Sequence, residues 1–398
     1  MKKKKQISSY LFLIFISLIT VVICLSIPVF AQTLPEEKTS DTISQDLDPL
    51  DIFSFKYYLP DLTPSDDVSI AFYDENLQKL DEQKIPIGKE TMDVKKTANQ
   101  IEAISNYDQQ NDLMLTIGKV SKNQTWQISN AYLLPLSTEN ITDKFASRKE
   151  VLNKVYTDYV SPYHDLRAVS AIDGDDSNYD GYTGGWHTYD ELVDTPTATS
   201  ESLEVYADGK KIVGDGTFST KELKIVTTNL VQAVNTKKRN GTGRPVLREK
   251  VSYIIIGGKI GVEVEATPLE DVTLKNYAFL QAATNNFNSC ILALGDPLYP
   301  YEIRNFTKDI WGSSRKKSQT TQLILSDSSN QLSLKIDPTV GIGNYRYNPT
   351  DSVWFYRSYG KVYFNPIATK DAAPLRLIKG QSFRAKGSYQ FSPVEKVE

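Results

Sequence analysis

Histidine and cysteine are scarce in this chain of 398 residues, which has two of each. Two histidines cannot provide a zinc site with three histidine ligands. Cys24 lies in an N-terminal segment that we expect to be removed, which would leave Cys290 without a partner for an intramolecular disulfide. An apolar run follows Cys290, so a buried structural residue is favoured over a nucleophile.

Signature motifs of several enzyme classes are also missing. The sequence has no P-loop, no dinucleotide-binding G-x-G-x-x-G, no G-x-S-x-G nucleophile elbow, no H-E-x-x-H zinc motif and no internal repeat of fixed period. The formal net charge is −4, so the chain has no general basic field that would attract nucleic acid. Nucleic acid is therefore not an expected partner.

The N-terminus has the three parts of a secretory signal peptide. Lys2 to Lys5 are followed by an apolar run from Tyr10 to Ile27, and Val29-Phe30-Ala31 offers small residues before a cleavage point. We therefore predict a signal peptide over residues 1–31, an acidic linker over residues 32–50, and a secreted or bacterial cell-surface protein. In the alternative, the apolar run stays uncleaved and anchors the chain, and the membrane is contacted only through this segment.

Short alternating runs separated by turn residues dominate the rest of the chain. The clearest hairpin joins residues 250–256 to residues 259–266 through Gly257-Gly258. With 23 tyrosines and 15 phenylalanines favouring strands, we predict a mainly β fold. A small N-terminal β-domain spans residues 51–140, a connector helix spans residues 141–161, and a large two-sheet antiparallel sandwich spans residues 162–398.

An Asp-rich and Gly-rich loop from Ala171 to His187 is the first candidate site. Its segment from Asp176 to Gly181 matches the first half of a calcium loop, D-x-N-x-D-G, in which alternate oxygen ligands converge. The twelfth position holds His187 instead of glutamate, so an EF-hand is not expected. A variant calcium site would use Asp173, Asp175, Asp176, Asn178 and Asp180. A solvated turn rich in aspartate is the alternative.

The same loop offers candidates for ligand binding and for catalysis. Trp186 and Tyr182 could form an aromatic platform for a sugar ring. His187 could transfer a proton with a carboxylate such as Glu265, or it could simply brace the loop. Lys237 and Arg244 belong to a basic turn that could contact an acidic polysaccharide, or that could be a solvated hairpin tip.

Several segments of the second half carry a resemblance to known families. They are Gly184 to His187, Thr195 to Thr197, Val205 to Gly209, Asn235 to Lys238 with Gly241 to Arg244, and Leu269 to Asp271. Together they resemble an uncharacterised β-domain of phage tail and bacterial surface proteins. The order of strands and glycines is also faintly similar to galactose-mutarotase-like supersandwich proteins. This resemblance implies relatedness but assigns little chemistry.

The sequence leaves three functions open. The first is an exported or surface β-sandwich that binds a surface polysaccharide or another glycan through the loop and its aromatic residues. The second is a glycan-active epimerase, lyase or hydrolase that uses His187 with a carboxylate. The third is a structural surface or assembly module in which the loop joins two β-regions.

Overall fold

Residues 91–136, 163–172, 174–176, 180–189, 195–241, 243–284, 287–293, 321–337, 353–356, 360–368 and 373–394 are described by a computed structural model. It also describes residues 145, 178 and 340, and the strand backbone at residues 43–44, 56–57, 68–73, 79–85, 301–305 and 310–311. The chain divides into two compact units, Met1–Lys89 and Glu90–Glu398.

The first unit contains two short antiparallel ladders. In one, β1 (Ile43–Ser44) pairs with β2 (Lys56–Tyr57), and in the other, β3 (Val68–Tyr73) pairs with β4 (Lys79–Ile85). The predicted signal peptide lies outside the described residues. So do the predicted linker, apart from β1, and the predicted connector helix, apart from residue 145. These expectations therefore stay predictions.

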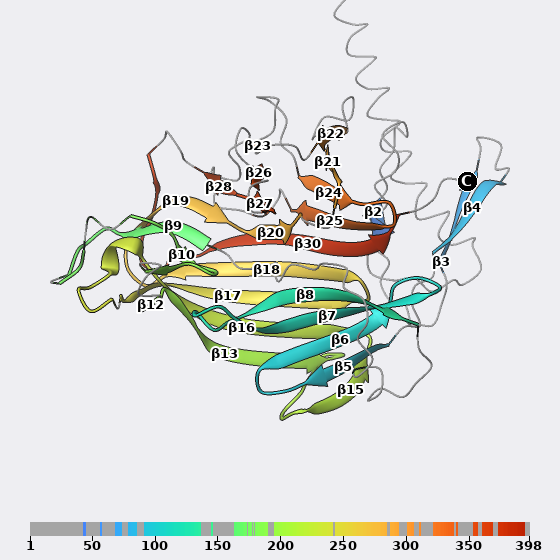
Figure 1. Ribbon diagram of the computed structural model, residues 1–398, viewed down its shortest axis with the longest axis horizontal. Helices are drawn as coiled ribbons and strands as arrows, with labels where there is room; N and C mark the ends of the chain where they lie inside the picture. The colour runs from blue at the N-terminus through green and yellow to red at the C-terminus, as the bar shows by residue number, and fades with distance from the viewer. Residues whose placement is uncertain are drawn as a thin grey trace, which may run out of the picture. The chain divides into compact units, whose positions relative to one another are not determined.

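A ten-stranded antiparallel sheet is the largest part of the second unit (Figure 1). Its order is β14-β13-β16-β17-β18-β30-β25-β24-β21-β22. The strand bounds are β13 (Ala198–Ala207), β14 (Lys210–Lys211), β16 (Leu223–Gln232), β17 (Pro245–Ile256), β18 (Lys259–Pro268), β21 (Ser289–Ala293), β22 (Tyr301–Asn305), β24 (Gln322–Ser326), β25 (Asn330–Ile336) and β30 (Phe383–Pro393).

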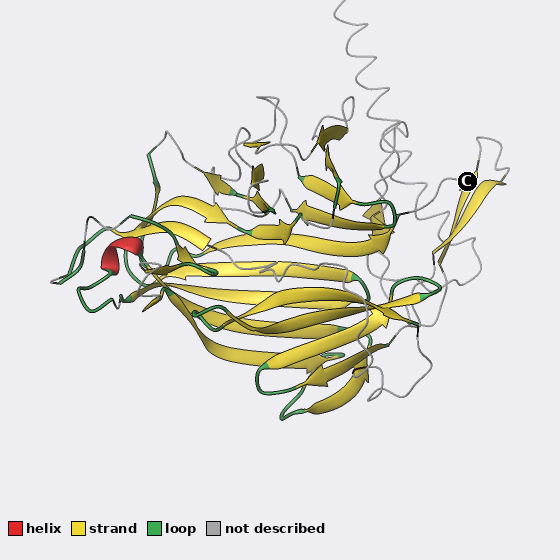
Figure 2. Ribbon diagram, in the orientation of Figure 1, coloured by secondary structure: helices red, strands yellow, loops and turns green. Residues whose placement is uncertain are grey.

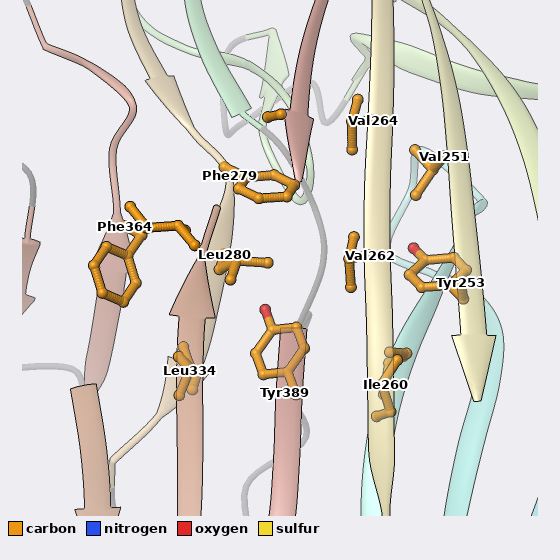
Figure 3. Packing of buried hydrophobic residues seen from close by; sticks show 14 of the residues in the cluster. Val251, Tyr253, Ile260, Val262, Val264, Phe279, Leu280, Leu334, Phe364 and Tyr389 are labelled. Atoms are coloured by element: carbon orange, nitrogen blue, oxygen red, sulfur yellow. The ribbon is translucent and has the colours of Figure 1, made fainter. Parts of the chain in front are cut away.

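Alternation along β17 and β18 explains how this sheet forms. Every second residue is buried, such as Val251, Tyr253 and Val262, while Lys250 and Glu263 between them face the other side. The predicted hairpin is confirmed, and Gly257 at its turn has φ 56°, which favours glycine. Figure 3 shows the buried side chains of β17, β18 and β30 gathered in one core with those of neighbouring strands.

A five-stranded sheet covers one end of the buried face. Its order is β15-β5-β6-β7-β8, with bounds β5 (Met92–Lys96), β6 (Gln100–Asn106), β7 (Asn111–Val120), β8 (Thr125–Pro135) and β15 (Gly216–Thr220). Tyr253 of β17 donates a hydrogen bond to the carbonyl of Trp126 in β8, which joins the two layers. Because β15 pairs with β5, these strands belong to the second unit. The predicted N-terminal domain of residues 51–140 includes strands of both units, and its boundaries stay a prediction.

Two smaller sheets pack on the middle of the same face. One has the order β10-β9-β19-β28 with β29 beside β19, and the other has the order β20-β27-β26-β23. The bounds are β9 (Tyr163–Ala168), β10 (Thr183–Gly184), β19 (Val272–Ala278), β20 (Leu280–Ala283), β23 (Ile310–Trp311), β26 (Val353–Tyr356), β27 (Lys361–Phe364), β28 (Ile367–Ala368) and β29 (Leu375–Leu377). Tyr389 of β30 donates to the carbonyl of Gln281 in β20, across the layers. The predicted mainly β, antiparallel sandwich is thereby confirmed.

Helix is almost absent from the described part of the chain. Figure 2 shows strands throughout and the short 3-10 helix η1 (Val234–Thr236). No helix among the described residues is long and apolar enough to cross a membrane.

Candidate ligand-binding site

The segment from Gly181 to His187, which we call the aromatic loop, runs between two short strand pairs. It includes β10, which pairs with β9, and it leads into β11 (Thr188–Tyr189), which pairs with β12 (Thr195–Pro196). Gly184 and Gly185 have φ 78° and 53°, a conformation that other residues rarely adopt, so the turn requires glycine. Beyond this turn, Trp186 is 40% exposed.

The side chain of Asn123 fixes the backbone of the aromatic loop. This asparagine is fully buried in the turn between β7 and β8. Its amide Nδ2 donates to the carbonyls of Gly185 (2.7 Å) and His187 (3.1 Å). Its Oδ1 accepts hydrogen bonds from the backbone N–H groups of Thr197 (2.9 Å) and Ala198 (3.3 Å). One side chain therefore ties the loop to the start of β13 through four hydrogen bonds.

The hydroxyl group of Thr197 joins the two ends of the turn from Gly184 to His187. Its hydroxyl donates to the carbonyl of His187 (2.5 Å) and accepts from the backbone N–H of Gly184 (3.0 Å). Asn123 and Thr197 are both fully buried. The loop is thus held in one shape by groups that solvent cannot reach, a form of preorganisation that reduces the ordering cost of binding a ligand.

Two aromatic rings of the loop reach the surface. Tyr182 is 39% exposed, and its ring centroid lies 5.3 Å from that of His187. The ammonium of Lys361, on β27, lies 6.0 Å from the centre of the Trp186 ring, within the range of a cation–π interaction. Burial, with the charges of Lys361 and His164, lowers the pKa of His187 to about 4. The loop therefore presents tyrosine, tryptophan and a neutral imidazole at neutral pH.

The acidic residues before this loop are engaged in local contacts. Asp175 accepts from the N–H of Ile172 (2.9 Å) and from the guanidinium of Arg244. Burial would raise the pKa of Asp175, but these two contacts outweigh it, and the pKa is lowered. Asp180 pairs with Arg167 (2.8 Å), and Asp176 accepts from the N–H of Asn178 (3.2 Å).

No cluster of three or more acidic, histidine or cysteine residues suited to a metal ion occurs in the part of the chain that the structure describes. Asp173, one of the five predicted ligands, lies outside the described residues. The calcium site therefore stays a prediction.

Arg244, a predicted ligand-binding residue, is held by contacts within the protein, and its role in binding stays a prediction. Its Nε and Nη2 donate to the Glu270 carboxylate (2.8 and 3.1 Å), its Nη2 also donates to the Ser170 carbonyl (3.0 Å), and its Nη1 holds Asp175. All three guanidinium nitrogens thus have protein partners. Lys237 accepts the backbone N–H of Asp176 at its carbonyl (2.6 Å), which fastens the basic turn to the acidic segment.

The predicted catalytic pair of His187 and Glu265 is not formed. Glu265 lies on the outer face of β18, with a side chain that is 40% exposed, and it pairs with Arg384 of β30 (3.2 Å). Alternation along β18 turns it away from the buried face, which holds Val264 and Ala266. His187 instead lies beside Tyr182 and near His164 and Lys361.

The sequence reasoning missed a carboxylate that does meet a histidine. Glu249 of β17 is 2% exposed, and one of its oxygens lies 2.8 Å from Nε2 of His164 in β9. Its signal in the sequence was its place two residues before Val251 and four before Tyr253, on the buried face of an alternating strand. Beside Glu249 is a cavity of about 10 Å³, lined also by Gln127, Asn229 and Gly185. This space holds about one water molecule and excludes a sugar.

Comparisons with known proteins bear on the fold alone. No family model matches the chain, and neither does any curated protein, so the resemblance to phage tail and surface proteins finds no support there. Among solved structures, a galactose 1-epimerase from Lactobacillus acidophilus is 9% identical, with a TM-score of 0.34, over 77% of this chain and 99% of its own.

Two further solved structures are similar at the same level. The galactosidase domain of the α-galactosidase-sucrose kinase AgaSK is 7% identical, with a TM-score of 0.39, over 81% of this chain and 42% of its own. A galactose mutarotase-like protein from Clostridium acetobutylicum is 10% identical, with a TM-score of 0.33, over 77% of this chain and 100% of its own. Scores this low indicate a faint similarity of architecture alone.

Most of the segments that suggested a family resemblance lie near the aromatic loop, whereas Val205 to Gly209 lies at the opposite end of β13. Gly184 and His187 bond to Thr197, and Arg244 bonds to Glu270. Asn235 donates to the carbonyl of Ala168 in β9 and accepts its N–H (3.0 and 2.8 Å). The motifs near the loop therefore brace one end of the sandwich.

Proposed function

We propose that this chain is an exported or cell-surface protein that binds carbohydrate through the aromatic loop. The observation that carries the proposal is the exposure of Trp186 and Tyr182 on a backbone fixed by the buried Asn123 and Thr197. An exposed tryptophan costs solvation free energy in an unliganded protein, and a sugar's C–H face offers it a matching surface. The predicted signal peptide supports a location where polysaccharide is the available ligand.

Binding is favoured over catalysis by the surroundings of the two histidines. His164 lies fully buried against Glu249, beside a cavity that excludes a sugar. His187 is closer to the surface, but the charges that act on it come from Lys361 and His164, and its proposed partner Glu265 pairs with Arg384. A general acid or base must lie within reach of the substrate, and His164, the histidine that contacts a carboxylate, is fully buried.

Affinity electrophoresis tests this proposal. The purified chain runs through native gels that contain a neutral polysaccharide (galactan, xylan or soluble starch) or teichoic-acid-bearing wall polymer. We expect retardation in at least one gel, and its loss in Trp186→Ala, with an unchanged thermal midpoint. Ile256→Ala is the matched control, because Ile256 is 56% exposed on β17 and lies outside the aromatic loop. Equal retardation of Trp186→Ala and wild type, or no retardation of wild type in any gel, would refute the proposal.

A further inference from the structure

A row of polar side chains crosses the small sheet beside the aromatic loop, on the face turned away from the ten-stranded sheet. On β9, His164 points inward to Glu249, so alternation turns Asp165 outward. On β19, Tyr277 packs inward against the His164 ring, so Asn276 beside it points outward. The register pairs Asp165 directly with Asn276. Their Cβ atoms are therefore about 5 Å apart.

A β-bulge at Lys275 sets the direction of Asn276. Leu274 pairs with Leu166 and Asn276 pairs with Asp165, so Lys275 is an extra residue on β19. In a regular strand, Asn276 would point into the core on the same face as Leu274. The bulge turns its amide to the face of Asp165 instead, which is how bulges direct side chains at binding sites.

The row continues into the aromatic loop at Tyr182. Thr183 of β10 pairs with His164 of β9, and the next pair of an antiparallel ladder is Tyr182 with Asp165. Burial, with the charges of Asp165 and Asp180, raises the pKa of Tyr182, which agrees with a carboxylate near its phenol. Tyr182 is 39% exposed and the side chain of Asp165 is 13% exposed. The row therefore opens to solvent at its tyrosine end.

Asn276 has hydrogen-bonding capacity that the described part of the chain does not use. It is 5% exposed, and its Nδ2 and Oδ1 are both buried without a hydrogen-bond partner among the described residues. Native proteins rarely keep such an amide, because an unmade hydrogen bond in the interior costs free energy. Beside it, the carboxylate of Asp165 lies 3.9 Å from the Lys275 ammonium, beyond hydrogen-bond distance. The pair thus has room for an added donor and acceptor.

A sugar ring has the groups that this row can bind. Each hydroxyl both donates and accepts, a carboxylate accepts, and a primary amide does both. Two side chains about 5 Å apart can reach adjacent hydroxyls of one ring, while the Tyr182 ring offers a face to its C–H groups. A phosphate or carboxylate group would bring no donor to Asp165 and would be repelled by its charge.

We propose that Asp165 and Asn276 recognise the sugar hydroxyls in the carbohydrate site of the aromatic loop. The inference rests on the proposed function and refines it, because it makes the ligand unit an uncharged sugar with two adjacent hydroxyls. Tyr182 packs on the ring, Asp165 accepts from one hydroxyl, and the Asn276 amide bonds to the next. Binding supplies the partner that this amide lacks among the described residues.

Asn276→Leu separates recognition from a structural role. Leucine is similar in size and has no polar atom, so it removes the unpaired amide without leaving a large cavity. If the amide were structural, its loss would lower stability, whereas an amide reserved for a ligand can be replaced without loss. Thr116→Val is the matched control, because the Thr116 hydroxyl of β7 is also buried without a partner in the described part of the chain.

Affinity electrophoresis in the galactan, xylan or starch gel that retards wild type, with urea unfolding alongside, tests the inference. We expect Asn276→Leu and Asp165→Ala to raise the dissociation constant at least tenfold, and Thr116→Val to bind like wild type. The urea midpoint of Asn276→Leu should equal or exceed that of wild type.

Three results would overturn hydroxyl recognition and leave the proposed function standing. They are binding of Asn276→Leu or Asp165→Ala within threefold of wild type, a lowered urea midpoint of Asn276→Leu, and retardation of wild type in the teichoic-acid gel alone. If no gel retards wild type, the proposed function fails and this inference fails with it.

Discussion

Replacement of Asn123 by alanine removes the support of the aromatic loop without touching its exposed rings. The change deletes four hydrogen bonds, two to carbonyls of the loop and two from N–H groups at the start of β13. A buried hydrogen bond contributes about 1 kcal/mol net, and each partner left unpaired costs about 1 to 3 kcal/mol. Some of the four freed backbone groups will reach water as the loop loosens, so we expect a loss of about 3 to 4 kcal/mol.

Urea unfolding measures this loss directly. With a slope of about 2 to 3 kcal/mol per molar urea, Asn123→Ala should lower the unfolding midpoint by about 1 to 2 M. Asn130→Ala is the matched control, because Asn130 is also buried but its amide donates only to the Ser129 hydroxyl, at 3.3 Å. The control should lose about 1 kcal/mol or less.

The same variant connects folding to the proposed function. Asn123→Ala should weaken retardation in the polysaccharide gel even at a temperature where the protein is fully folded, because the loop then pays an ordering cost on binding. A midpoint within about 0.3 M urea of that of Asn130→Ala would show that the four contacts do not support the loop. Unchanged retardation would show that the loop's shape does not matter for binding.

The remaining predictions concern two charged or titratable groups near the loop. Arg244→Met should lower the free energy of unfolding, measured in urea, by about 2 kcal/mol. The substitution leaves the carboxylate of Asp175, whose side chain is fully buried, without its cationic partner. Its control Arg248→Met should lose less than about 0.5 kcal/mol, because Arg248 and Glu201 are both nearly half exposed; equal losses would contradict the bracing role. The free energy of unfolding of His187→Gln should fall less than that of wild type as the pH is lowered. The lowered pKa of His187 means that the folded chain binds fewer protons than the unfolded chain between about pH 4 and 6.5, so wild-type stability falls as pH falls through that range. Parallel acid profiles for the two proteins would refute this.

The sequence predicted the fold class because strand alternation is local. Buried Ile260, Val262 and Val264 alternate with outward residues, and Gly257 supplies the turn of the hairpin. The extent of each sheet, in contrast, depends on pairing between segments that are distant in the sequence. Residues 216–220 form β15 and pair with β5, more than 100 positions earlier, and no feature of either segment announces that partner. Long-range pairing of this kind cannot be predicted from local alternation.

The sequence could indicate only those site residues that lie close together in the chain. Trp186, Tyr182 and His187 lie together because they are neighbours in the chain. Arg244 and Glu265 were predicted from local sequence, which does not show the partners of a charged side chain. In the folded chain Arg244 is held by Glu270 and Asp175, and Glu265 by Arg384. Glu249 was overlooked because a single glutamate in a long strand is common. Only its position on the buried face of the strand, which it shares with Val251 and Tyr253, distinguishes it.

Both histidines of the chain lie at this one end of the sandwich, and their environments separate them chemically. His164 is fixed between the carbonyl of Thr183 and the carboxyl of Glu249. His187 lies between Tyr182 and the charge of Lys361, which favours the neutral ring. A positive charge on the inner ring disfavours one on the outer ring, because the two act on each other through the buried interior. His164 therefore contacts the carbonyl of Thr183, next to the loop, while the His187 ring stays uncharged at neutral pH beside the exposed aromatic residues. That arrangement keeps the histidine with the carboxyl partner away from solvent and sets a neutral ring beside the exposed aromatic residues, which suits recognition of a neutral sugar face.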